Sequence, residues 1–178
     1  MAKGNSWKTR NHSYREPRKI LERELKSVPQ YKVEDLYISP FTQKKRYDED
    51  GHWQYVAIER RTAPTGIHIM DEYLRYLAAG KSDIQAFVDA HGLKTEELAA
   101  MVFILTGMKG VRFRQLYQVR MVDDLLRYTD LPFDEVAKRS GLGSPNNMYL
   151  SLRRECNMSA TERRDFLRKE GDLGRFRM

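Results

Sequence analysis

The sequence predicts a mainly α-helical fold in which two helix-turn-helix units are joined by a long helix and preceded by a small extension that contains a β-hairpin. Three observations support this prediction. The apolar spacing becomes helical from Ile67 onward, a helix, glycine turn and helix occur twice after it, and a short alternating segment follows Asp50-Gly51. We therefore expect two parts, residues 1–66 as a basic extension and residues 67–178 as the helical domain.

The extension is expected to begin with a disordered segment, because residues 1–13 are polar and carry scattered cations. Pro17 to Ser27 predicts an amphipathic helix, since proline is tolerated in a first turn and Pro29 follows its end. The residues from Tyr31 to Phe41 then favour a β-strand.

Asp50-Gly51 predicts a tight hairpin turn, because both residues tolerate positive φ. Trp53, Tyr55 and Ala57 alternate with their neighbours, which indicates a strand after that turn. About three strands are too few for an independent barrel. We therefore expect this piece to pack on the rest of the protein.

The helical part divides at its glycines. The first helix runs from residue 67 until Gly80, a second from Asp83 to His91, and a third from Thr95 to Thr106, with Gly92 and Gly107 as turns. A long helix is expected over 111–128. The pattern then repeats with a helix around Phe133, Val136 and Ala137, a turn at Gly141, a helix over 144–155 and a last helix that starts near Ser159.

The second unit has the features of a DNA recognition element. Ser144 is a helix cap and Pro145 suits the first helical position, while Met148 and Leu152 face inward. The next residues, Asn146 and Asn147, are expected to point outward, where an amide can pair with an adenine edge in the major groove. Flanking cations are expected to contact phosphates: Lys138, Arg139, Arg153 and Arg154.

Residues of about 67–165 resemble the AraC-family DNA-binding domain, in which seven helices form two helix-turn-helix units around a long helix. The resemblance is carried by Thr129 to Leu142, by Ser144-Pro145-Asn146-Asn147-Met148 with Leu152-Arg153-Arg154, by Met158-Ser159-Ala160 to Arg164, and in the first unit by Gly92, Leu98 and Gly107. It implies duplex DNA as a partner and transcription regulation as the function, with Ser144 and Leu150 joining the two asparagines at the bases.

The chain also departs from the family pattern. Ala160, Asn157 and Leu150 stand where proline, glycine and arginine are common. In the first unit, the positions that would face DNA hold Glu96, Glu97, Ala99 and Ala100, and carboxylates repel phosphates. The helix then continues through the apolar residues 101–105. We therefore expect the first unit to be covered by protein, either the strand around Trp53 and Tyr55 or a second subunit, with Phe103, Ile104 and Trp53 as the candidate protein interface.

Composition narrows the function classes further. The net charge is +7, with 14 Lys/Arg against 9 Asp/Glu in residues 1–66, 4 against 6 in 67–110 and 14 against 10 in 111–178, which suits a polyanion partner. Cys156 is the single cysteine, the four histidines lack metal-ligand spacing, and no catalytic motif occurs. We expect a cytoplasmic protein that is not an enzyme, with no metal, cofactor, membrane contact or small-molecule effector.

The sequence thus favours sequence-specific duplex DNA binding, mainly through the second unit. Two alternatives remain open at this point. One is a protein-interaction module that retains the fold without contacting bases, as the acidic first unit allows. The other is an accessory DNA-binding protein of a mobile element, with the basic N-terminal region as a second contact.

Overall fold

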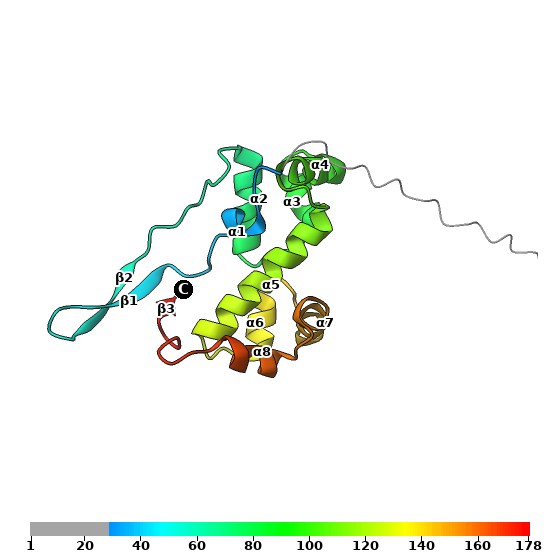
Figure 1. The fold of residues 1–178 in the computed structure, drawn as a ribbon. Helices are drawn as coiled ribbons and strands as arrows, with labels where there is room; N and C mark the ends of the chain where they lie inside the picture. The colour runs from blue at the N-terminus through cyan, green and yellow to red at the C-terminus, as the bar shows by residue number, and fades with distance from the viewer. Residues whose placement is uncertain (1–28) are drawn as a thin grey trace, which may run out of the picture.

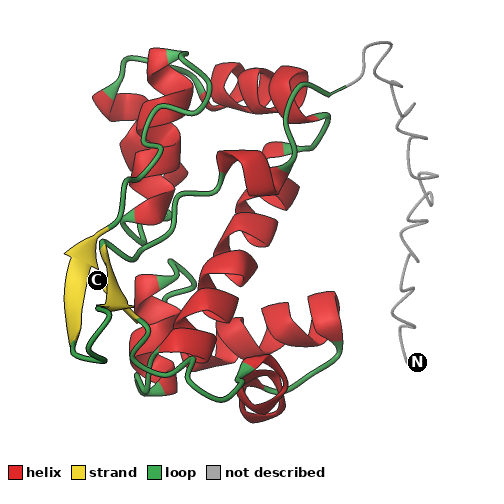
Figure 2. Ribbon diagram, turned by 60° about the vertical axis from the view of Figure 1, so that its left-hand side comes forward, coloured by secondary structure: helices red, strands yellow, loops and turns green. Residues whose placement is uncertain are grey.

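A single long helix organises the molecule. The computed structural model describes residues 29–178, so the expectations for residues 1–13 and for the helix at 17–27 lie outside the described part. Helices α2, α3 and α4 gather at one end of α5, and α6, α7 and α8 gather at the other (Figures 1 and 2). The predicted mainly α fold, with two helix-turn-helix units on a long helix, is confirmed. The helices are α1 (Val33–Leu36), α2 (His68–Ala78), α3 (Ile84–Ala90), α4 (Thr95–Thr106), α5 (Gly110–Tyr128), α6 (Phe133–Arg139), α7 (Pro145–Cys156) and α8 (Ala160–Leu167).

A small antiparallel sheet lies on the side of α5 opposite α7 (Figure 1). Its strands are β1 (Gln43–Tyr47), β2 (Trp53–Ala57) and β3 (Phe176–Arg177), in the order β2-β1-β3. A hairpin turn at Asp50-Gly51 and the strand after it were predicted, whereas strand β1 over residues 43–47 and its pairing with residues from the C-terminal end of the chain were not. Tyr47 pairs with Trp53, which leaves a five-residue loop, residues 48–52.

The turn in this hairpin differs from the predicted tight type. Gly51 has φ +82°, but Asp50 does not share a positive φ, since Asn157 is the one non-glycine residue in 29–178 that has one. The loop is closed instead by Asp48, whose Oδ1 accepts backbone N–H groups from Asp50 at 3.1 Å and His52 at 2.8 Å. The Asp48 carboxylate therefore closes the loop, where a two-residue turn was predicted to do so.

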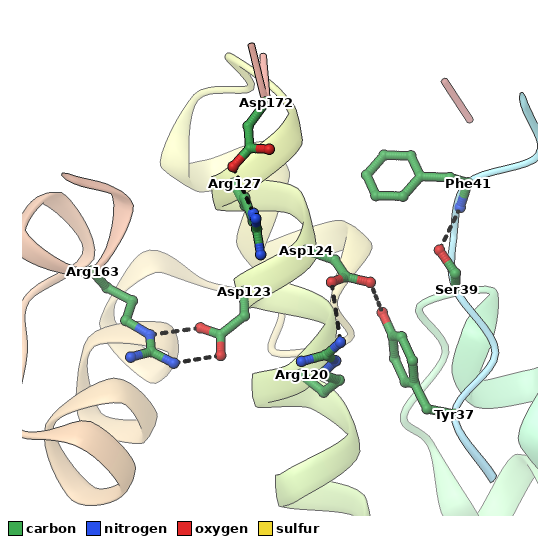
Figure 3. Close-up of polar contacts among 9 residues, drawn as sticks. All are labelled: Tyr37, Ser39, Phe41, Arg120, Asp123, Asp124, Arg127, Arg163 and Asp172. Carbon is green, nitrogen blue, oxygen red and sulfur yellow. Dashed lines mark hydrogen bonds and ion pairs between the residues drawn. The ribbon is translucent and has the colours of Figure 1, made fainter. Parts of the chain in front are cut away.

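The strand predicted between Tyr31 and Phe41 is wrong. The segment forms the four-residue helix α1 and then an irregular chain, in which Ser39 Oγ accepts the backbone N–H of Phe41 at 3.2 Å (Figure 3). Several of its apolar side chains are buried in the main core, where Leu36 is fully covered and Phe41 is 2% exposed. Packing thus overrides the local β preference.

The expectation that this piece packs on the rest of the protein is confirmed. The buried residues Val33, Leu36, Ile38 and Phe41 belong to the same hydrophobic cluster as the helices. Phe41 lies against Tyr128 of α5 at 5.7 Å between ring centroids. Residues on both sides of position 66 therefore share one core, while a domain boundary there stays a prediction.

Polar contacts along α5 attach three other parts of the chain to it (Figure 3). The Arg163 guanidinium donates to both carboxylate oxygens of Asp123 at 2.8 and 2.6 Å, which holds α8. Tyr37 donates its hydroxyl to Asp124 at 2.9 Å, and burial raises the pKa of both groups. The three attachments are Asp123–Arg163, Asp124–Tyr37 and Arg127–Asp172.

The two units touch each other through glycines. Gly80 follows α2 with φ +72° and Gly141 follows α6 with φ +78°. A Cβ on Gly80 would lie 2.4 Å from the carbonyl oxygen of Arg139, and one on Gly141 would lie 3.1 Å from the carbonyl oxygen of Gly80. Gln118 of α5 donates its amide N–H to the Gly141 carbonyl at 2.9 Å. The contact thus requires residues without side chains.

Among residues 29–178, no helix is both long enough and apolar enough to cross a membrane.

Candidate nucleic-acid interface

Helix α7 presents its polar side chains away from the core because of how it begins. Ser144 caps it by accepting the backbone N–H of Asn147 at 3.3 Å, and Pro145 occupies the first turn. Met148 and Leu152 are buried four residues apart and fix the rotation of the helix. The opposite side is therefore exposed. It carries Asn146, Asn147, Tyr149, Leu150, Arg153 and Arg154.

The two asparagines differ in how free their amides are. Asn147 donates its side-chain N–H to the carbonyl of Leu142 at 3.0 Å, across the turn that precedes the helix. This bond orients the amide and leaves its oxygen and second N–H available. Asn146 is exposed at the start of the helix. Leu150, one turn later, is 55% exposed.

The four predicted phosphate contacts fall into two groups. Arg153 and Arg154 lie on α7, where Arg153 donates to the Tyr149 hydroxyl at 3.3 Å and to the Asn157 carbonyl at 3.1 Å. Lys138 and Arg139 lie at the end of α6 and form ion pairs within it. Glu135 is 3.2 Å from Lys138 and 3.6 Å from Arg139, and this neighbour raises the pKa of Lys138.

Arg139 lies toward the sheet rather than toward α7. Its guanidinium donates to the sulfur of Met178, next to β3, at 3.4 Å. The structure therefore brings Arg153 and Arg154 together with the asparagines and places Arg139 elsewhere.

A cleft beside α7 contains residues that the sequence analysis did not identify. It has a volume of about 380 Å³ and lies between α7, the middle of α5 and the loop before α3. Arg114 of α5 donates to the carbonyl of Ser82 at 3.2 Å, and Gln115 lies next to it on the cleft wall. The sequence signal that could have identified the cleft residues of α5 was the presence of polar residues within the long helix. The cleft is lined by Ser82, Arg114, Gln115, Gln118, Gly141, Leu142, Asn147, Leu150, Ser151 and Arg154.

Helix α4 is the counterpart of α7 at an offset of 50 residues. Both are 12 residues long, and each is followed by a left-handed residue, Gly107 at φ 70° and Asn157 at φ 54°. The equivalent positions differ in chemistry. The positions of Asn146, Asn147, Leu150, Arg153 and Arg154 hold Glu96, Glu97, Ala100, Phe103 and Ile104.

Glu97 has a local role that the sequence analysis missed. Its carboxylate accepts the backbone N–H of Lys94 at 2.8 Å and so caps the start of α4. The acidic pair of the first unit is therefore not a pair of equivalent surface charges. Both glutamates are exposed, and Glu96 makes no such capping bond.

An apolar groove of about 630 Å³ runs along α4. Leu98, Ala99 and Phe103 of α4 line it, together with Val111 of α5. Arg114 lines this groove and also the cleft beside α7, so the two hollows flank one arginine. The first unit thus offers a hydrocarbon surface where the second offers amides and guanidinium groups.

The expectation that the strand around Trp53 covers this helix is wrong for the described part of the chain. Ile104 is 62% exposed and Trp53 is 52% exposed. The hairpin and α4 lie at different ends of the molecule (Figure 1). Pro29 lies near the end of α4 instead, and the next two residues donate backbone N–H groups to the Leu105 carbonyl at 3.1 Å each.

One acidic cluster corrects the expectation that no histidine has metal-ligand neighbours. The possible ligand atoms of Asp48, Asp50 and His52 lie within 4.8 Å of one another in the hairpin loop. All three residues are exposed, and Asp48 is occupied by the two backbone N–H groups that close the loop. The loop hydrogen bonds account for this arrangement.

No protein-family model matches the sequence, and no curated protein matches it either. The structure is similar to the C-terminal domain of AraT, a response regulator from Geobacillus stearothermophilus, with a TM-score of 0.52 and 14% sequence identity. The match covers 62% of this chain and 92% of that domain. At this identity the likeness shows the fold alone, a mainly α arrangement of helix-turn-helix units.

Proposed function

We propose that the protein binds duplex DNA sequence-specifically through α7 and acts in transcription regulation. The observation that carries this proposal is the exposed face of α7, which begins with two asparagines and ends with two arginines. The resemblance of residues 67–165 to AraC-family DNA-binding domains supports it. The amides and guanidinium groups on this face suit binding rather than reaction with a substrate, so we propose a role without catalysis.

The geometry suits a helix that enters the major groove from its N-terminal end. The Asn146 amide can pair bidentately with an adenine edge, and the Leu150 side chain can contact a thymine methyl group. Arg153 and Arg154 lie two turns further along, where a helix leaving the groove approaches phosphates. Arg114 extends the cationic surface toward the first unit.

The test begins with selection of bound sequences from a random duplex pool, followed by measurement of affinity for the selected and a scrambled site. Asn146→Ala with Asn147→Ala should reduce discrimination by about 1–3 kcal/mol, the value of a good bidentate base contact. Lys44→Ala, on the far side of the molecule, is the matched control. Equal losses on both DNAs would contradict base contacts by these residues.

A second candidate function has its own observation. The apolar groove on α4 and the exposed Ile104 favour a protein-interaction module that keeps the fold without contacting bases. Salt-dependent duplex binding separates the two functions, because each phosphate contact contributes a slope of about 0.9 in log affinity against log salt. A protein without that dependence would be an interaction module. An accessory role in a mobile element would keep duplex binding and is compatible with the first proposal.

A further inference from the structure

One face of the sheet combines cations and aromatic rings. Side chains of adjacent paired residues share a face, so the register places Tyr55 beside Lys45 and Trp53 beside Tyr47. Arg177 of β3 pairs with Gln43 and belongs to the same face. We call Lys45, Tyr47, Trp53, Tyr55 and Arg177 the aromatic sheet face.

The rings and cations of this face contact one another. The Lys45 ammonium lies 4.3 Å from the Trp53 ring centroid, and the Arg177 guanidinium lies 3.7 Å from that of Tyr55. Trp53 and Tyr55 meet edge to face at 5.6 Å. Tyr47 and Trp53 remain accessible all the same, at 60% and 52% exposed, and Tyr55 is half-buried.

The charge of the face is not neutralised by acids. The three strands contain no aspartate or glutamate. Among residues 29–178, none of the ion pairs involves Lys45 or Arg177. Both cations therefore have no acidic partner among the described residues, in contrast to Lys138 and Arg139 on α6.

We propose that the aromatic sheet face binds single-stranded nucleic acid. Aromatic rings on an exposed strand surface stack with unpaired bases, and adjacent cations contact the phosphates. Residues two apart in a strand are about 7 Å apart, so Trp53 and Tyr55 present successive positions to an extended strand. A duplex cannot use such rings, because its bases already stack on one another.

This site is separate from the duplex interface of the proposed function. The sheet and α7 lie on opposite sides of α5 (Figure 1). Most of the face comes from residues 43–57, and β3 completes it from the other end of the chain. Binding at the sheet therefore does not depend on binding at α7, and either can fail alone.

The test uses the full chain and Trp53 as the probe. Trp7 is the only other tryptophan, so Trp7→Phe makes Trp53 the single indole. Titration with 15-nucleotide oligo-dT and oligo-U should quench Trp53 emission, whereas a blunt DNA duplex of the same length should not. Tighter binding of oligo-U would point to contacts with the 2′-hydroxyl, and equal binding to stacking and phosphate contacts alone. Either outcome supports the site, and absence of quenching by both oligonucleotides would overturn it.

Variants then separate stacking from bulk charge. Trp53→Ala should weaken oligo-dT binding about tenfold, measured by anisotropy of a labelled strand, and Trp53→Phe should restore most of it. Lys45→Ala with Arg177→Ala should lower the salt slope by about 1.4, the value for two single-strand phosphate contacts. The matched control, Lys44→Ala with Arg46→Ala, removes two cations from the opposite face and should leave the slope unchanged. Equal effects of the two double variants would overturn the proposal, and circular dichroism checks that each variant is folded.

Discussion

At the scale of single residues, Asp172 links α5 to the loop that precedes the last strand. Its carboxylate is buried, accepts from Arg127 at 2.8 Å and from the Lys169 backbone at 3.1 Å, and these bonds lower its pKa. A lowered pKa in the folded state stabilises the fold above the unfolded value of about 3.9, and this contribution is lost as pH falls through the folded value.

We therefore expect Asp172→Asn to lower the free energy of unfolding by about 1–2 kcal/mol at pH 7, since the amide oxygen can still accept these hydrogen bonds but lacks the negative charge that strengthens them. The difference from the unaltered protein should shrink below about pH 4. Urea unfolding at pH 7 and pH 3.5 measures both. Asp165→Asn, at an exposed carboxylate, is the control. A difference that stays constant with pH would contradict the assignment.

The two glutamates of α4 call for separate treatment. Glu97 caps the helix, so its replacement changes stability as well as charge. Glu96→Lys leaves that capping bond in place and should raise non-specific duplex affinity and the salt slope, while the preferred site stays the same. Filter binding of specific and scrambled duplexes at several salt concentrations is the measurement. Loss of site preference would show that α4 contacts bases after all.

At the scale of elements, α4 and α7 have the same length but are followed by different residue types. Both of these following residues adopt a left-handed backbone conformation. Asn157 has φ 54°, a conformation that asparagine tolerates better than other side-chain residues. Asn157→Ala should therefore cost about 1 kcal/mol of stability, whereas Asn157→Gly should cost nothing or stabilise. Both variants keep the carbonyl that Arg153 contacts. Chemical denaturation that finds the alanine variant unchanged would contradict this explanation.

The elements differ in how well the sequence predicts them. Asp83, Ser144 and the glycines at 92, 107 and 141 mark helix ends, and the structure places caps or positive φ at each. The strand predicted for the segment before β1 is wrong because the apolar residues there are buried by tertiary contacts, which local alternation does not encode. Strand β1 consists of Gln43-Lys44-Lys45-Arg46-Tyr47, so it had no apolar pattern to detect.

At the scale of the whole molecule, α5 fixes the distance between the two units. Its 19 residues span about 28 Å, close to the roughly 34 Å turn of B-DNA. The long helix therefore sets a spacing at which one chain can address adjacent major grooves. Because the first unit offers Glu96, Phe103 and Ile104, we expect chemical footprinting to show strong base protection in one groove segment only. Protection of two successive segments would show that α4 also docks.

The candidate site was predictable where it depends on one helix. Asn146, Asn147 and the α7 arginines follow from the cap and the 3.6-residue period. Arg114, Gln115 and Ser82 were not predictable, because three elements that are distant in sequence bring them to one cleft. The aromatic sheet face likewise needs β3, whose two residues carry no strand signal of their own.

The strand order β2-β1-β3 has a consequence for the behaviour of the protein in concentrated solution. Strand β2 is an outer strand, so one row of its backbone N–H and C=O groups has no partner within the sheet, and its five residues carry no charge. Such an edge is a template for strand addition between molecules, which charge repulsion opposes. The net charge of +7 supplies that repulsion, and added salt screens it. Solubility should therefore fall as the salt concentration rises.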